Sequence, residues 1–575
     1  MLKDERFKGL TPNSLKRDFI AGLTVSIVAI PLGMAFAVAS GVKPEYGLYT
    51  TIIAGILVSL FGGSKYQIAG PTGAFIPILL VIVLQYGYED LLIAGFLAGL
   101  MLILMGFFNL GNLIKYIPRS VTIGFTAGIA VIIFSGQIGD FLGIEGLEKK
   151  EYFHQNMIQI MQNLDKVNWF SIFTAAIGLA VIIFIPKLFP RIPVLLVAIA
   201  IPTIIASVFY PNQVVTIGSA FGGIPQGLPR IHFPEITLEK VLTLWQPAFV
   251  IAMLGGIESL LSAVVADGMT GKRHNSNREL VGQGIANMVT PLFGGIPATG
   301  AIARTATNIK SGAASPLSGI FQGLIVLITL LLFAPYAAYI PLASLAPILM
   351  VVAFNMSEHK SFIHMVKLKT SDSLVLIVTF LLTVFVNLTI AVPIGLLLAM
   401  ASFIKRMSEV LEIERVIPAR LKNNANDEMH KFESTCPQIS FFTVEGPLFF
   451  GAADKFESVI TYHINKRPKV LILKMKHVSI IDATGIANLS SLVRDFHKTG
   501  GVTLFSEVNP KVEHMLKISG LYDEIGKKYF FQSSTDAVDY AIGIVDSEKC
   551  SLCSRKGSPS CNVYLKGQNI RATIS

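Results

Sequence analysis

Long apolar stretches separated by short polar loops fill the sequence from residue 18 to residue 406. A helix needs roughly 17 to 25 mostly apolar residues to cross a bilayer, and this region resolves into fourteen apolar segments. Two of them, near residues 72–84 and 301–310, are too short to cross alone. The pattern predicts a polytopic α-helical membrane domain over residues 18–406, preceded by a segment of residues 1–17.

The pattern changes after Arg406. A charged linker, residues 407–432, leads into a region without a spanning segment. Four short segments there alternate between strand and helix patterns: strands at 441–450, 469–475 and 502–507, and an amphipathic helix at 485–497. This alternation predicts a small α/β domain over residues 433–545, followed by a flexible tail of residues 546–575.

Two similar helix-breaking segments lie 227 residues apart, Pro-Thr-Gly-Ala at residues 71–74 and Ala-Thr-Gly-Ala at residues 298–301. Two more pairs recur at nearly this offset: 35–41 with 262–268, and 116–118 with 339–341. Matched breaks in two halves of a chain indicate a secondary transporter and point to its substrate site. We therefore predict repeats of about residues 18–209 and 243–406. Each has seven crossings, an odd number, so their topologies are inverted.

Composition and charge support this topology. The chain is 52% hydrophobic and only 15% charged, with a mean hydropathy of +0.62, so a bilayer must cover apolar surface that a soluble core cannot hold. With the N-terminus inside, nineteen basic residues fall on the cytoplasmic side and six fall outside. The positive-inside rule thus predicts that both termini lie in the cytoplasm, and we expect the protein in the plasma (inner) membrane. It also accounts for the net charge of +10 without nucleic acid.

The two breaks predict an anion site made largely of main chain. Pro71, Gly73 and Gly300 would interrupt two helices, so that two half-helix N-termini meet near the membrane midplane. Each N-terminus presents unpaired amides and a partial positive charge of roughly half a unit. We expect Gly73, Gly300 and Ala301 to bind substrate through this main chain. Arg304, one turn into the second half-helix, would add a full positive charge, or would instead snorkel or pair with Glu258.

Glu258 stands in an apolar stretch from Phe249 to Val265, so it must be paired, hydrated or protonated. A carboxylate that takes up a proton when an anion binds would couple the two in a symport. Asp267 lies nearer the predicted cytoplasmic helix end, and we interpret it as structural.

The chain resembles a known family at several of these places. Four parts of the chain are similar to the SulP anion transporters with their STAS domain: the first membrane segment, the Gly-Pro break at residues 70–71, Glu-Ser-Leu-Leu-Ser at 258–262 and the terminal α/β domain. The resemblance covers nearly all of residues 10–545. Residues 300–304 and 355–358 are most similar to the enterobacterial C4-dicarboxylate transporter, and cyanobacterial sodium-dependent bicarbonate members are also similar.

This resemblance implies a core and a gate domain, a homodimer and elevator-like alternating access. It implies that Phe36 and Thr72 line the anion pocket. In the bicarbonate members the sodium-binding positions carry Asp and Thr, whereas this chain has Glu258 and Ser262. That difference favours protons over sodium as the coupling ion.

Several alternatives stay open. Sulfate, bicarbonate and C4-dicarboxylates all suit amide-rich sites, so the anion is not determined, and a sodium-coupled bicarbonate transporter is one alternative. Another is a membrane-bound regulator whose STAS domain signals through Thr484, where phosphorylation at a helix start would add negative charge; a plain capping turn is the simpler interpretation. A nucleobase permease would share the fold, but Arg304 and the terminal domain disfavour it.

The sequence predicts neither an enzyme nor a cofactor. It has no P-loop, and its membrane region lacks zinc-ligand spacing. Cys550, Cys553 and Cys561 in the tail form an incomplete zinc set, which leaves a metal or redox role open. The expected partners are a small inorganic or carboxylate anion, the bilayer, a second copy of the chain and a cytoplasmic protein bound through the STAS domain.

Overall fold

The computed structural model forms two compact units, residues 1–399 and 400–575, with the division inside one long helix. The structure describes residues 4–546 except 9, 113–116, 190–192, 228, 230, 232, 387, 416–437 and 465–466. Most of the predicted linker and the cysteine-containing tail, including Cys550, Cys553 and Cys561, therefore lie outside the described residues.

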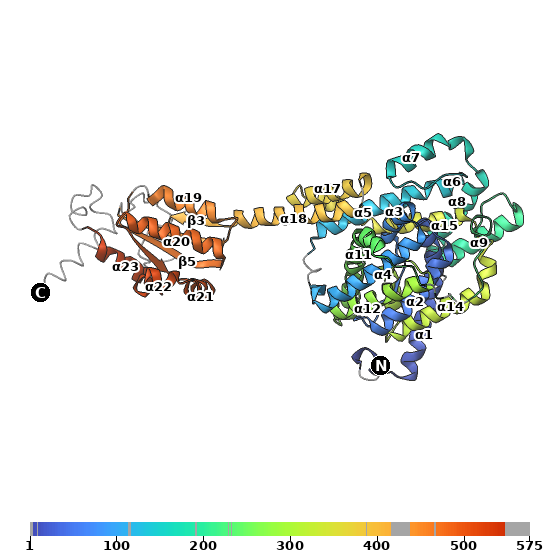
Figure 1. Ribbon diagram of the computed structural model, residues 1–575, viewed down its shortest axis with the longest axis horizontal. Helices are drawn as coiled ribbons and strands as arrows, with labels where there is room; N and C mark the ends of the chain where they lie inside the picture. Colours follow the sequence, from blue (N-terminus) through green and yellow to red (C-terminus); the bar gives the residue numbers. More distant parts are fainter. Residues whose placement is uncertain are drawn as a thin grey trace. The chain divides into compact units, whose positions relative to one another are not determined.

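The membrane unit is almost entirely helical (Figure 1). Its first half contains α1 (Pro12–Ala39), α2 (Pro44–Phe61), α3 (Ile76–Tyr86), α4 (Tyr88–Phe107), α5 (Arg119–Gly136), α6 (Ile138–Leu142), α7 (Phe153–Gln162), α8 (Trp169–Leu188), α9 (Val194–Phe209) and α10 (Ile217–Phe221). Its second half contains α11 (Leu238–Thr270), α12 (Ser276–Val289), α13 (Ile302–Lys310), α14 (Leu317–Ala337), α15 (Leu342–Met356), α16 (His359–Lys367), α17 (Ser371–Phe385) and α18 (Leu388–Glu409).

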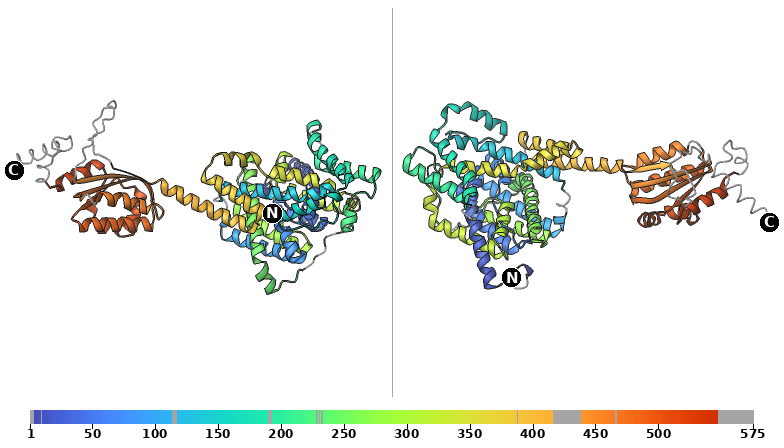
Figure 2. Two further views of the ribbon diagram at one scale, coloured as in Figure 1. Left: turned by 90° about the horizontal axis from the view of Figure 1, so that it is seen from above. Right: turned by 180° about the vertical axis from the view of Figure 1, so that it is seen from behind.

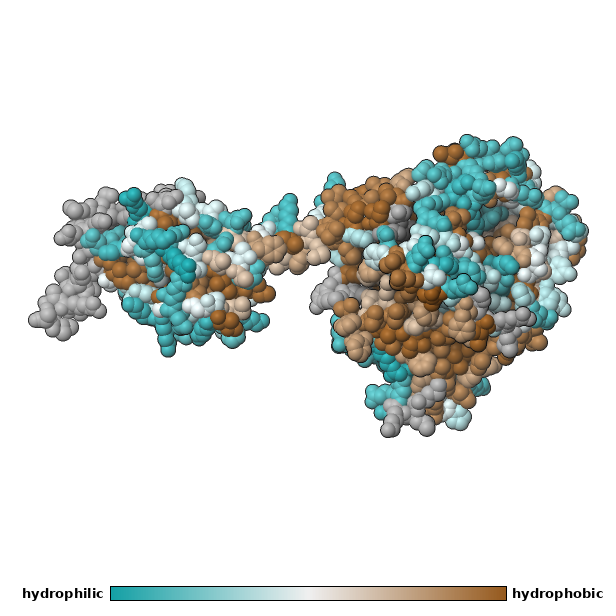
Figure 3. Space-filling model, viewed as in Figure 1, coloured by the Kyte–Doolittle hydropathy of each residue, from teal (hydrophilic) through white to brown (hydrophobic). Residues whose placement is uncertain are grey.

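Helix length and hydropathy confirm a helical membrane protein. Within the described residues, nine helices are long and apolar enough to cross a bilayer, and three apolar helices are shorter. A count of fourteen crossings would need the polar α12 and the short α13 as well, and it stays a prediction. Figure 3 shows a broad hydrophobic face on this unit, as expected for a surface covered by lipid.

The helices pack into two bundles that each draw on both halves of the chain. We call α1–α4 with α11–α14 the core bundle, in which α4 packs on α11 and α12, and α14 packs on α1 and α2. We call α5–α9 with α15–α17 the gate bundle, in which α5 packs on α15 and α17, and α8 packs on α9 and α15. Packing between the bundles is thinner and involves mainly α1 with α9 and α15, and α3 with α5.

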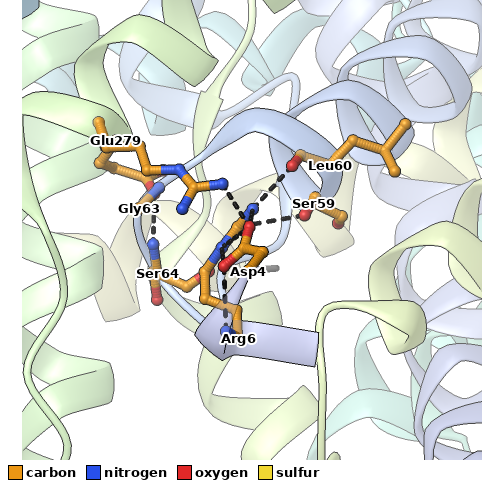
Figure 4. Close-up of polar contacts among 8 residues, drawn as sticks. Asp4, Arg6, Ser59, Leu60, Gly63, Ser64 and Glu279 are labelled. Carbon is orange, nitrogen blue, oxygen red and sulfur yellow. Dashed lines mark hydrogen bonds and ion pairs between the residues drawn. The ribbon is translucent and has the colours of Figure 1, made fainter. Parts of the chain in front are cut away.

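The N-terminal segment is attached to the core bundle by Arg6 (Figure 4). This buried side chain donates to main-chain oxygens at the end of α2 and in the turn beyond it: Ser59 at 3.2 Å, Leu60 at 2.7 Å and Ser64 at 3.3 Å. Carbonyls at a helix C-terminus lack helical partners, so a cation stabilises them. Asp4 joins Arg6 to Arg278 of α12. Burial would raise the pKa of Asp4, but the hydrogen bonds from both arginines outweigh it and lower the pKa.

Two buried carboxylates connect the halves of the core bundle. Glu279 of α12 accepts hydrogen bonds from the amides of Gly63 and Ser64, at 2.8 and 2.9 Å. Asp18 of α1 accepts from the amide and hydroxyl of Ser315, just before α14, at 2.9 and 2.6 Å. Both are structural, because each satisfies main-chain donors that would otherwise be buried without partners.

The second unit contains a five-stranded sheet with the order β3-β4-β5-β6-β7 (Figure 2). The strands are β3 (Glu412–Arg415), β4 (Ile439–Leu448), β5 (Val470–Ile481), β6 (Val502–Ser506) and β7 (Phe530–Phe531). Only β3 is antiparallel to its neighbour. The helices are α19 (Ala453–Ile464), α20 (Ala483–Lys498), α21 (Pro510–Ile518), α22 (Leu521–Ile525) and α23 (Ser534–Ile544). The predicted small α/β domain is confirmed.

Helices cover both faces of this sheet, and successive side chains of a strand point to opposite faces. In β4, Phe442 packs with α19 and α20 on one face, whereas Phe441 packs with α23 on the other.

Candidate functional site

A short antiparallel strand pair brings the two predicted breaks together. β1 (Ala69–Gly70) pairs with β2 (Thr299–Gly300), so that Ala69 lies opposite Gly300. A 3-10 turn (Gly73–Phe75) leads from β1 into α3, and α13 begins at Ile302, directly after β2. The first-turn amides of both helices lack helical carbonyl partners. Unpaired amides of this kind can hold an anion, and the predicted anion site at the two breaks stays a prediction.

Glu258 reaches this place from α11. Its Oε2 accepts a hydrogen bond from the Thr72 hydroxyl at 2.8 Å, and the side chain is partly exposed. In the part of the chain that the structure describes, no ion pair joins Glu258 to Arg304, so the predicted alternative of such a pair is not observed. A carboxyl group that is partly exposed can exchange protons with water.

Among the described residues, Arg304 is the largest fully buried side chain, with 1% of its surface exposed. Its Nη2 donates to the Pro71 oxygen at 3.1 Å, and its guanidinium lies 5.9 Å from the ring centre of Phe36, within the range of a cation–π interaction. Among the described residues its Nη1 has no hydrogen-bond partner. Arg304 thus holds the main chain at Pro71 from a buried position, and its role toward an anion stays a prediction.

The gate bundle supplies one wall of the site. A Cβ on Gly73 would lie 2.9 Å from the Met356 sulfur, 3.5 Å from Ile133 and 3.6 Å from the Phe36 ring. Met356 ends α15 and Ile133 belongs to α5, so the two bundles meet at Gly73. Met356 falls within the family-like segment 355–358, but nothing in the sequence indicates that it faces Gly73.

A network of hydroxyl and amide groups holds the strand pair, and the sequence does not predict it. The Ser259 hydroxyl accepts from the Gly300 amide at 3.0 Å and pairs with the Thr299 hydroxyl at 2.8 Å. The Gln67 side-chain amide donates to the Ser259 main-chain oxygen at 2.9 Å. A Cβ at Gly300 would overlap this Gln67 amide, so a larger residue there would displace the Gln67 side chain from its bond to Ser259. The Gly300 amide thus donates within the protein, to the Ser259 hydroxyl.

Two other predicted residues are also engaged by neighbours. The Ala301 amide donates to the Ile68 oxygen at 2.8 Å, which leaves the amides from Ile302 onward for a ligand. The Ser262 hydroxyl donates to Thr305 at 3.2 Å and is fully buried. The roles of Ala301 and Ser262 stay predictions.

Asp267 is held by contacts at the end of α11, and Thr484 belongs to the second unit. Asp267, in the last turn of α11, accepts from the His274 ring at 2.7 Å, which fits the structural role predicted for it. Thr484 is exposed in the first turn of α20, next to the capping residue Asp482. Its modification stays a prediction. The described residues contain no group of three His, Cys, Asp or Glu arranged to hold a metal ion.

Sequence comparisons match both units. Residues 15–379 match the Sulfate permease family, and residues 434–537 match the STAS domain. YvdB of Bacillus subtilis, named as a candidate sulfate transporter, is 53% identical over 528 residues, covering 92% of this chain and 98% of YvdB. The bicarbonate transporter BicA of a Picosynechococcus strain is 33% identical over 465 residues, covering 76% of this chain and 80% of BicA.

Solved structures share the fold. The overall structure of SLC26A9 superposes with a TM-score of 0.82 at 20% identity, covering 95% of this chain and 92% of that chain. The transmembrane domain of a cyanobacterial BicA gives a TM-score of 0.60 at 30% identity, covering 68% of this chain and 98% of that chain. Because the family match spans more than half of the chain and both predicted units are recovered, the chain belongs to the Sulfate permease family and carries a STAS domain after its membrane unit.

Proposed function

We propose that the protein is a secondary active anion transporter that couples anion movement to protons. One observation carries the proposal: the pairing of β1 with β2 brings two helix N-termini together. At this place Arg304 bonds to Pro71, and Glu258 bonds to Thr72. The amides and the guanidinium favour an anion. Glu258 is the acid that can bind and release the coupled proton.

The substrate class follows from family and charge. YvdB is named for sulfate and BicA for bicarbonate, and the buried Arg304 favours anions of higher charge, such as sulfate or a C4-dicarboxylate. The alternative of sodium-coupled bicarbonate transport receives less support, because this chain has Glu258 and Ser262 where the bicarbonate members it resembles have Asp and Thr.

Uptake into proteoliposomes tests the proposal. Labelled sulfate, succinate and bicarbonate are offered to the purified protein under separately imposed proton and sodium gradients. We expect sulfate or succinate to accumulate with an inward proton gradient and not with sodium alone. Accumulation of bicarbonate driven only by sodium would support the alternative, and no uptake of any anion would support a regulatory protein that acts through its STAS domain.

Alternating access would require the core bundle to move against the gate bundle, as in an elevator. On the side opposite the termini by the predicted topology, the loop between α6 and α7 bridges the two. Lys149 in this loop donates to main-chain oxygens at the end of α1, those of Val38 and Ala39. Glu151 accepts from Gln85 of α3 at 3.1 Å. Burial lowers the pKa of Lys149, and the nearby Asp140 carboxylate opposes this.

Breaking the Lys149 contact should favour opening on that side. In a background without the four native cysteines, Leu80→Cys, which lines the cavity beside Lys149, reports access by a membrane-impermeant maleimide. We expect Lys149→Met to speed this labelling roughly fivefold, the value of about one hydrogen bond. Lys150→Met is the matched control, because Lys150 bonds to Glu148 in the same loop. Equal rates in both variants would contradict a bridging role for Lys149.

The STAS domain would regulate or assemble the transporter without forming the anion path, in a plasma membrane homodimer with both termini in the cytoplasm. All the site residues lie before Arg406. Truncation after Arg406 should therefore keep the ratio of sulfate to succinate uptake while changing rate, stability or dimer yield. An altered ratio in well-folded truncated protein would refute this division. Thr484→Ala tests only whether modification at this helix start regulates the protein.

A further inference from the structure

Thr72 occupies an unusual position for a residue at a helix start. It precedes the 3-10 turn that leads into α3, where a threonine side chain commonly caps the following amides. Here its side chain makes no capping bond. It turns instead to α11 and donates to Glu258 at 2.8 Å, while only 9% of the residue is exposed. The hydroxyl is thus committed to the acid rather than to its own helix.

The direction of this hydrogen bond depends on the proton of Glu258. An ionised carboxylate only accepts, so Thr72 must donate its single hydroxyl proton to it. A protonated Glu258 can donate to the Thr72 oxygen instead. The Thr72 proton is then free to point toward an anion at the start of α3. One proton bound by Glu258 therefore adds one hydrogen-bond donor to the anion site.

We propose that Thr72 is the relay through which protonation of Glu258 strengthens anion binding. The inference rests on the proposed function and adds the residue that links its two ligands. Of the side chains around the pair, α13 contributes the charged Arg304, whereas Phe36 of α1 and Met356 of α15 do not titrate. Protonation of Glu258 therefore changes the donor that Thr72 offers to the anion as well as the charge of Glu258. When Glu258 releases the proton, the Thr72 hydroxyl again donates to Glu258, and anion binding becomes weaker.

A comparison of two pH values separates a relay from a simple ligand. Sulfate and succinate affinities of the purified full chain are measured by calorimetry at acid and alkaline pH. We expect Thr72→Val, which keeps the shape and removes the hydroxyl, to weaken binding about tenfold at acid pH. At alkaline pH, where Thr72 is bound to Glu258, its effect should be less than twofold. Thr72→Ser should behave like the natural protein at both values.

A mutant cycle completes the test. In Glu258→Gln, whose amide can donate to Thr72 at every pH, adding Thr72→Val should cost about tenfold at both pH values. Thr24→Val is the control, because the exposed Thr24 hydroxyl bonds to its own helix. The same loss for Thr72→Val at both pH values in the natural background would overturn the relay. Absence of sulfate and succinate binding in the natural protein would overturn the proposed function itself.

Discussion

Replacing Glu258 by glutamine should abolish proton-driven accumulation of the anion while leaving binding and exchange in place. Glutamine keeps the size of the side chain and can keep a hydrogen bond to Thr72, but it cannot carry a proton. One pH unit is worth about 1.4 kcal/mol per coupled proton, or about tenfold in accumulation. The Glu258→Gln protein should lose this factor entirely.

Proteoliposomes with an imposed pH difference provide the measurement, and exchange of labelled for unlabelled sulfate verifies that the variant is folded. Glu239→Gln is the matched control, because Glu239 lies exposed in the first turn of the same helix, α11. Full pH-driven accumulation by Glu258→Gln would rule out this acid as the coupling residue.

Arg304→Ala should weaken the binding of divalent anions much more than that of monovalent ones. Coulomb energy scales with the charge of the ligand, and at an effective dielectric of about 20 a unit charge at about 6 Å is worth roughly 3 kcal/mol. The loss in binding free energy should therefore be about twice as large for sulfate as for a monovalent anion of similar size.

Arg304 also holds the Pro71 oxygen, so its removal has a structural component as well. Arg304→Gln separates the two effects, since glutamine can donate to Pro71 without a charge. We expect Arg304→Gln to lose the preference for divalent anions and Arg304→Lys to keep it, as measured by competition between sulfate and a monovalent anion. Equal losses for both anion classes in Arg304→Ala and Arg304→Gln would identify a residue that only supports the fold.

The sequence predicts the elements of the site better than their contacts. The two breaks are visible because Pro and Gly interrupt apolar runs, and Glu258 is visible because a charge in an apolar helix is costly. The pairing of Ala69 with Gly300 is not predictable in this way, because a strand of two residues has no periodic pattern. The partner of Glu258, Thr72, lies 186 residues away.

Polar residues that hydrogen-bond to one another are even harder to recognise in the sequence. Ser259 and Thr299 look like ordinary small residues of a membrane helix and a turn, because hydroxyls there often bond to their own backbone. Arg6 counts in the sequence only as one of many basic residues near the N-terminus, yet it is buried at the end of α2. Such roles depend on which chain segments meet, and hydrophobic patterns do not specify that.

The core bundle combines helices from both halves of the chain, so its contacts form in a fixed order during biosynthesis. The Ile68 amide has its partner in the Thr305 hydroxyl, 237 residues later in the chain. At synthesis rates of roughly 5 to 20 residues per second, that partner emerges roughly 10 to 50 s after Ile68 does. Through this interval β1 and the Asp18 carboxylate lack their partners, while the first half of the chain already lies in the membrane. The strand pair of β1 and β2 is thus completed late in the synthesis of the membrane unit, and a nascent chain stopped before α13 would hold an unpaired edge for the cell to recognise.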